Sequence, residues 1–101
     1  MNYTIQFSPE ATNDLTDILG WYKEQQTPDL QKKFITAMSN ALKMLSQSPK
    51  SYALRFKNVR CAIIKKYPYN VYYWIDDNSQ IINIFAVLHQ SRSPKVWKKR
   101  L

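Results

Sequence analysis

Two helix-start signals near the N-terminus constrain the fold of this chain most. The triplets Ser8–Glu10 and Thr27–Asp29 each combine a capping side chain, a proline suited to the first helical turn and an acidic residue suited to the positive end of a helix dipole. Apolar residues at helical spacing follow both triplets: Ala11, Leu15, Ile18 and Tyr22, then Leu30, Phe34, Met38, Ala41 and Leu45. Because only a few residues join the two segments, they predict an antiparallel helical hairpin that Pro49 closes.

Strand-like segments flank this hairpin on both sides. Tyr3–Phe7 alternates apolar and polar residues, which is typical of a half-buried strand. After the hairpin come Tyr52–Lys57, Arg60–Tyr67, Val71–Ile75 and Gln80–Leu88, with a turn at 76–79 and a short basic tail at 95–101. The last of these strands is apolar on both faces, so we expect it to lie inside the sheet, with the helices over one side. The sequence predicts one α+β domain over 1–101: an N-terminal strand, an antiparallel helical hairpin, then a three- to four-stranded antiparallel meander in two layers.

Composition excludes several classes of protein. Gly20 is the only glycine, so a glycine-rich phosphate loop is excluded. With one histidine and one cysteine, the chain has no set of residues for a metal site, and we expect no cofactor. The single Cys61 cannot form an internal disulfide, and there is neither a signal peptide nor a stretch of apolar residues long enough for a membrane span. We therefore expect a cytoplasmic protein.

Positive charge is concentrated in the second half of the chain. Residues 1–49 carry four basic and five acidic side chains, whereas residues 50–101 carry eleven basic and two acidic ones. A net charge of +8 serves solubility in some proteins. Its segregation instead favours a binding face for nucleic acid, for an acidic protein, or for both.

The predicted binding residues lie on the strands, in the loop after the last strand and in the basic tail. We expect contacts to a target or a nucleic acid from Arg55, Arg60, Lys65, Arg92, Lys95, Trp97, Lys98 and Lys99. Trp97 has two interpretations, because a tryptophan on a short charged tail is either a plug against the core or an exposed anchor. Most of the aromatic residues at 67–74 are interpreted as sheet packing, although they could also stack on bases.

In this order and at these separations, several segments resemble the RelE/ParE toxin superfamily over essentially the full length. They are Tyr3–Ala11, Asp14–Ile18, Trp21–Tyr22, Leu45 with Pro49, Tyr52 with Arg55, Val59–Arg60, Tyr67–Tyr73, and Ile84–His89 with Arg92, Pro94 and Trp97. The resemblance implies a toxin of a type II toxin–antitoxin system, a plasmid-stabilising, growth-inhibiting protein encoded beside an antitoxin. RelE-like members cleave mRNA at the ribosomal decoding site without a metal, whereas ParE-like members poison DNA gyrase.

Residues of the nuclease branch are replaced in this sequence. That branch uses cationic side chains on the central strands and, in many members, a C-terminal tyrosine. The matching positions hold Asn70 in place of an arginine, Cys61 and Ile63 in place of two lysines, and Trp97 in place of the tyrosine. Metal-free RNA cleavage needs a base, an acid and cations around the phosphate, and an indole cannot act as a base. The resemblance is therefore closer to the ParE-like branch.

Three hypotheses about function remain open at this stage. We favour ParE-like inhibition of DNA gyrase. The first alternative is a ribosome-dependent endoribonuclease, whose only catalytic candidates are Arg60, His89 and Arg92; His89 is more readily interpreted as a packing residue. The second alternative is a non-toxic module that binds an antitoxin or DNA. In each case we expect a hetero-oligomer in which an acidic, amphipathic segment of the antitoxin binds a groove beside the helical hairpin or an open sheet edge.

Overall fold

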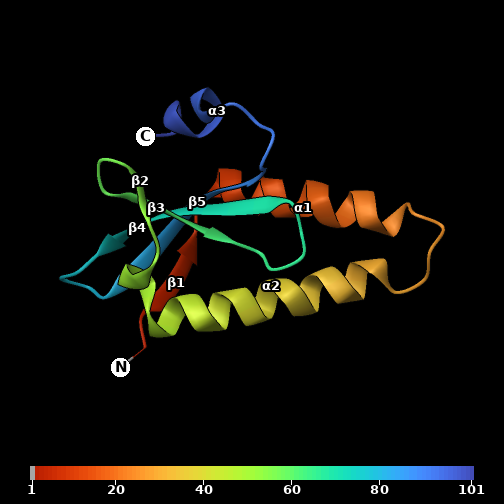
Figure 1. Cartoon of the computed structure of the whole chain (residues 1–101), viewed down its shortest axis with the longest axis horizontal. Coiled ribbons are helices and arrows are strands. Elements are labelled where there is room, and N and C mark those ends of the chain that lie inside the picture. Colours follow the sequence, from red (N-terminus) through yellow and green to blue (C-terminus); the bar gives the residue numbers. More distant parts are fainter. Residues whose placement is uncertain (1) are drawn as a thin grey trace.

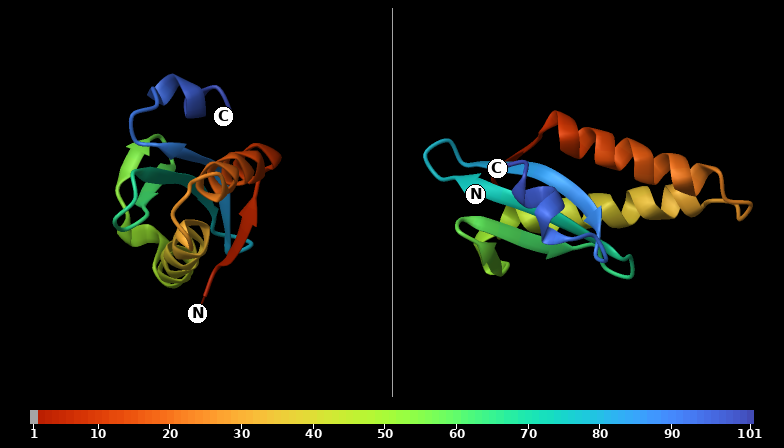
Figure 2. Two further views of the ribbon diagram at one scale, coloured as in Figure 1. Left: turned by 90° about the vertical axis from the view of Figure 1, so that its right-hand side faces the viewer. Right: turned by 90° about the horizontal axis from the view of Figure 1, so that it is seen from above.

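The computed structural model describes residues 2–101 of the chain (Figure 1). The elements in order are β1 (Thr4–Phe7), α1 (Pro9–Lys23), α2 (Leu30–Gln47), a 3-10 turn (Pro49–Ser51), β2 (Leu54–Phe56), β3 (Val59–Ile63), β4 (Tyr69–Asp76), β5 (Ile81–His89) and α3 (Pro94–Lys98). The α+β class is confirmed, with the N-terminal strand, the helical hairpin and the later strands in the predicted order. Figure 2 shows α1 and α2 side by side along the molecule.

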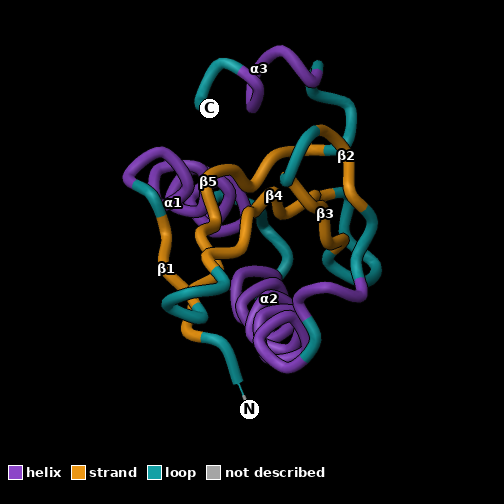
Figure 3. The backbone as a smooth tube through the Cα atoms, turned by 90° about the vertical axis from the view of Figure 1, so that its left-hand side faces the viewer, coloured by secondary structure: helices purple, strands orange, loops and turns teal. Residues whose placement is uncertain are grey.

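All five strands form one sheet in the order β1-β5-β4-β3-β2 (Figure 3). Strands β2 to β5 make the predicted antiparallel meander. Strand β1 pairs in parallel with the outer edge of β5, from Thr4 opposite Ile81 to Phe7 opposite Ile84. β5 therefore lies between two neighbours, as its apolar faces predicted.

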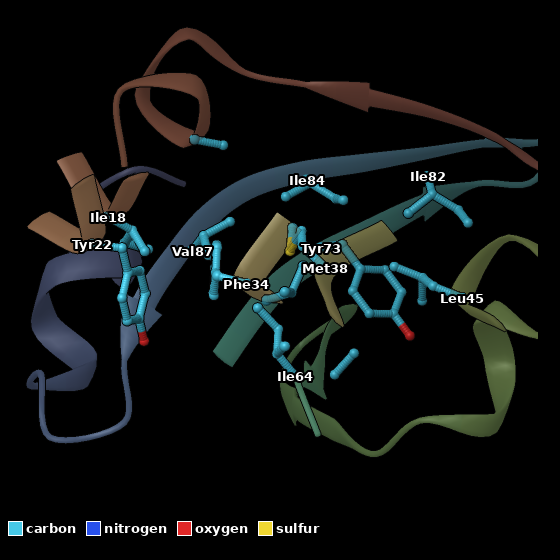
Figure 4. Packing of buried hydrophobic residues seen from close by; sticks show 13 residues of the cluster. Ile18, Tyr22, Phe34, Met38, Leu45, Ile64, Tyr73, Ile82, Ile84 and Val87 are labelled. Carbon is cyan, nitrogen blue, oxygen red and sulfur yellow. The ribbon is translucent and has the colours of Figure 1, made fainter. Parts of the chain in front are cut away.

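The larger core lies between the helical hairpin and one face of the sheet. Figure 4 shows Tyr22, Phe34 and Tyr73 among its buried side chains. Two residues next to the predicted helical stripes are exposed instead, since Trp21 is 54% and Met44 is 63% accessible. The stripes that the sequence predicts therefore reach the core, whereas these two neighbouring side chains do not.

A second, smaller core covers the opposite face of the sheet. Figure 1 shows α3 on the other side of the sheet from α2. Trp97 of α3 is 4% exposed and stacks on Tyr72 of β4, with ring centroids 4.8 Å apart and planes inclined by 20°. Phe85 and Phe56 contact the same indole edge-on. The helix α3 thus adds a partial layer to the two that the sequence predicts.

The two helix-start signals have different outcomes. The Ser8 hydroxyl accepts a hydrogen bond from the Ala11 amide at 3.1 Å, which confirms the first. The second is wrong as a capping signal, because Asp29 has a φ of 69° and its side chain makes no capping hydrogen bond. Pro28 lies in the turn before α2 rather than in its first helical turn.

Candidate functional site

A groove of about 830 Å³ lies between α2 and the outer part of β3. Its floor is apolar and its rim is basic. The lining residues are Lys33, Thr36, Ala37, Asn40, Ala41, Lys43, Met44, Tyr52, Ala62, Ile63, Lys65, Lys66 and Tyr67. Met44 and Ile63 are 63% and 59% exposed, and exposed apolar side chains that line one concave surface are typical of a binding site.

The groove opens because β2 is too short to cover β3. β2 pairs with β3 only as far as the Cys61 amide, which donates to the Ala53 carbonyl at 3.2 Å. Backbone groups alternate sides along a strand, so the next groups that face outward are those of Ile63. The outward-facing backbone groups of Ile63 lie beyond the end of β2. The opposite edge of β3 at this position pairs with β4. The sheet therefore has an open edge beside the apolar floor of the groove.

The lining of this groove contains no acidic residue. Four lysines surround it: Lys33, Lys43, Lys65 and Lys66. Lys65 and Lys66 lie in the turn after β3 and are both exposed, and Lys66 has a φ of 70°. The predicted target-binding residue Lys65 is thus at the groove rim rather than on a strand face. An apolar floor with a cationic rim suits a partner segment with apolar and acidic side chains.

Arg60 has a structural role in this arrangement. Its guanidinium donates to the Tyr52 carbonyl at 2.6 Å and to the Lys50 carbonyl at 3.1 Å. These bonds fix the chain where it enters β2. Because one nitrogen, Nη1, makes both bonds, that nitrogen is not available to a phosphate.

His89 and Arg92 lie at another end of the sheet. The Nδ1 atom of His89 accepts from the Ser91 amide at 3.1 Å and lies 2.8 Å from the Ser91 hydroxyl oxygen. Arg92 shares with it a small cavity of about 130 Å³ that Asp17 also lines. Along β4, the partners of Arg60 and His89 are four residues apart, which is about 13 Å along a strand. The structure therefore does not bring the three catalytic candidates together.

The remaining candidates gather around α3 and β2. Trp97 is the plug of the second core, so its interpretation as an exposed anchor is wrong. Lys95, Lys98 and Lys99 are exposed on α3. Arg55 is exposed on β2. Burial raises the pKa of the Cys61 thiol, and the nearby Arg55 charge acts against that rise.

One contact on which the fold depends is not indicated by the sequence. Asp14 lies off the apolar stripe of α1, which favours solvent exposure, yet its carboxylate accepts from Arg100 and from the backbone amide of Val87. The Arg100 guanidinium has a raised pKa, because it donates to this carboxylate. No signal in the sequence joins two residues so far apart.

Over residues 2–101, no group of three or more His, Cys, Asp or Glu side chains could hold a metal ion. Within the same residues, no helix is both long enough and apolar enough to cross a membrane.

Comparisons with known proteins identify the family. A family profile described as "ParE toxin of type II toxin-antitoxin system, parDE" matches residues 5–94. No curated protein sequence matches the chain. Among solved structures, the chain is similar to a chain of the chromosomal ParDE system from P. aeruginosa, with a TM-score of 0.72, 18% identity, and coverage of 86% of this chain and 95% of that one.

Two further structures share the fold. A mutant of the E. coli toxin RelE in the free state has a TM-score of 0.69 and 15% identity, covering 100% of this chain and 99% of that one. A chain of the RelBE2 toxin–antitoxin complex from Mycobacterium tuberculosis has a TM-score of 0.61 and 24% identity, covering 88% and 99%. These structural similarities establish the fold alone. The family profile establishes the family, because it matches residues 5–94, which is most of the chain. The chain therefore belongs to the ParE toxin family of type II toxin–antitoxin systems.

Proposed function

We propose that this chain is a cytoplasmic toxin that inhibits DNA gyrase and does not cleave RNA. Membership of the ParE toxin family supports gyrase as the target, and the separation of Arg60 from His89 and Arg92 is the observation that argues against RNA cleavage. Metal-free cleavage of RNA needs a base near the 2′-hydroxyl and cations around the same phosphate. Here the β4 partners of Arg60 and of the only histidine, His89, are Tyr73 and Tyr69, which are about 13 Å apart along the strand. At this separation we do not expect the two side chains to act on one phosphodiester.

The environments of the candidate catalytic residues support the same conclusion. The Arg60 guanidinium is held by two backbone carbonyls. Trp97, which replaces the tyrosine of the nuclease branch, is buried between α3 and the sheet and carries no basic group. None of these side chains is arranged to take up or deliver a proton at a bound phosphate.

Expression of the chain in bacteria tests this proposal. We expect growth arrest with loss of negative supercoiling in a reporter plasmid, while the 5′ ends of cellular transcripts stay unchanged. Cleaved transcripts with unchanged supercoiling would establish the endoribonuclease instead. Continued growth would establish a non-toxic module that binds an antitoxin or DNA.

We propose further that an antitoxin neutralises the toxin through the groove between α2 and β3. The open backbone edge at Ile63 accepts a strand from the partner, and the exposed side chains of Met44 and Ile63 take up its apolar residues. The four rim lysines select acidic side chains. A disordered, acidic, amphipathic segment that folds on binding has this chemistry, and the resulting complex is a hetero-oligomer.

Introduction of a negative charge into the groove tests this second proposal. The partner in this assay is the cognate antitoxin, purified separately. Ile63→Glu places a negative charge in the groove, and we expect the Kd of the toxin for the antitoxin to rise at least tenfold. Trp21→Glu is the matched control, because Trp21 is similarly exposed but does not line the groove. Equal affinities for both variants would exclude the groove as the binding site.

A further inference from the structure

Two lysines from distant parts of the chain share one aromatic ring on the α3 side of the sheet. The Nζ atom of Lys98 on α3 lies 4.5 Å from the centroid of the Phe56 ring, and the Nζ atom of Lys57 lies 5.2 Å from it. The two ammonium groups are therefore within about 10 Å of each other. The ring holds both in place through cation–π attraction, which offsets part of their mutual repulsion.

More cations surround this pair. On α3, Lys95 lies three and four residues before Lys98 and Lys99, so these side chains share one side of the helix. Arg55 lies on the neighbouring β2. Within residues 2–101, none of these five cations forms an ion pair with a carboxylate, since the two ion pairs are Lys50–Asp77 and Arg100–Asp14.

We infer that this surface, defined by Lys57, Lys98, Lys95, Lys99 and Arg55, binds the phosphate backbone of duplex DNA without sequence specificity. Phosphates recur about every 3.4 Å of helix axis along one DNA strand, so two ammonium groups no more than about 10 Å apart can contact neighbouring phosphates of one strand. Lysine ammonium groups contact phosphates as point charges and do not read bases.

The aromatic residues beneath these lysines favour duplex over single-stranded nucleic acid. Proteins bind single strands by stacking bases on exposed aromatic rings. On this side of the sheet, Trp97 and Tyr72 are 4% and 6% exposed, and Phe56 lies under the two ammonium groups. The rings thus support the cations and offer no stacking platform.

Fluorescence anisotropy with the purified toxin tests this inference in the absence of gyrase and antitoxin. The probes are a short labelled DNA duplex of arbitrary sequence, its single strand, and a polyglutamate peptide of matched charge. We expect the duplex to bind most tightly, with an affinity that falls steeply as salt rises. The double variant Lys57→Gln/Lys98→Gln should reduce the slope of log K against log salt by about 2, since each lost phosphate contact removes about one.

The control is Lys23→Gln/Lys32→Gln, which removes the same charge from the end of the hairpin where α1 connects to α2 (Figure 1). We expect it to leave the slope near that of the natural chain. If both double variants reduced this slope equally, the attraction between the toxin and DNA would be diffuse, and the proposed surface would be overturned. Equal or tighter binding of the single strand or of polyglutamate would overturn the preference for duplex DNA. Circular dichroism establishes that each variant is folded.

Discussion

Arg100, which follows α3, donates two hydrogen bonds to the carboxylate of Asp14 on α1, at 2.6 and 3.1 Å. The same carboxylate accepts from the Val87 amide at 2.9 Å, and Arg100 also donates to the Phe85 carbonyl at 3.1 Å. β1 ends at Phe7, so the outer edge of β5 has no neighbouring strand there. The ion pair takes the place of that strand and joins α1 to the C-terminal segment.

Removal of Asp14 should be more damaging than removal of Arg100. Asp14→Ala leaves both the Arg100 charge and the Val87 amide without their partner, and we expect the free energy of unfolding to fall by about 3 kcal/mol. Arg100→Met keeps the apolar stem and leaves the Val87 bond intact, so its loss should be about 1 kcal/mol. Urea unfolding followed by circular dichroism measures both. Losses of equal size would contradict the role of Asp14 at the edge of β5.

Trp97 should contribute more to stability than any exposed tryptophan. Trp97→Ala empties the second core beneath α3, and we expect a loss of about 3 kcal/mol or more in the free energy of unfolding. Trp21→Ala is the control, because Trp21 is 54% exposed and its loss should change stability by less than about 0.5 kcal/mol. Thermal unfolding compares the two. A Trp97→Ala variant as stable as the control would mean that α3 does not pack on the sheet.

Tyr73 links the sheet to the chain segment after α2. Its hydroxyl donates to the Pro49 carbonyl at 2.6 Å, and the side chain is fully buried. Tyr73→Phe leaves that carbonyl unsatisfied, so we expect the free energy of unfolding to fall by about 1–2 kcal/mol. Tyr52→Phe serves as a control, since Tyr52 is only partly buried. If both variants unfold at the same denaturant concentration as the natural chain, the Tyr73 bond does not contribute to stability.

The stability of this fold should decrease at alkaline pH. Burial, followed by the neighbouring Tyr69 and Tyr67, raises the pKa of Tyr22 to about 12, from an unfolded value near 10. A raised pKa means that the folded state favours the neutral phenol. Its contribution is therefore complete below pH 10 and is lost as pH rises from about 10 to 12. Burial also raises the pKa of Tyr73, so both residues act in the same direction.

Unfolding free energies measured between pH 9 and 12, with tyrosinate absorbance recorded alongside, test this dependence. Tyr22→Phe should reduce the alkaline loss of stability without abolishing it, because Tyr73 still titrates. An unchanged pH profile in Tyr22→Phe would mean that Tyr22 ionises equally easily in the folded and unfolded chain.

The parts of the fold that depend on neighbouring residues were predictable from sequence. Ser8 caps a helix three residues away, and Asp76 accepts from the Asn78 and Ser79 amides in the predicted turn. Thr27–Asp29 contains the same kinds of residue as the first start signal, but these residues form the turn before α2. Asp29 has a left-handed backbone conformation in this turn.

The site residues were harder to predict, because their partners are distant in sequence. Asp14 lies off the apolar stripe of α1, which indicates solvent, but its partner Arg100 is 86 residues later. Arg60 was identified as a cation for a phosphate, whereas its hydrogen-bond partners are carbonyls of the segment before β2. Helical and strand periodicity predict the face of the element on which a side chain lies. They do not predict which residue of another element will contact that side chain.

A supercoiling assay with purified components distinguishes inhibition of gyrase from cleavage of RNA. Relaxed plasmid, gyrase and ATP are mixed with increasing amounts of the toxin, and a parallel reaction contains programmed ribosomes with labelled mRNA. We expect supercoiling to decrease as toxin is added while the mRNA stays intact. Cleavage of the ribosome-bound mRNA with unaffected gyrase would contradict this expectation.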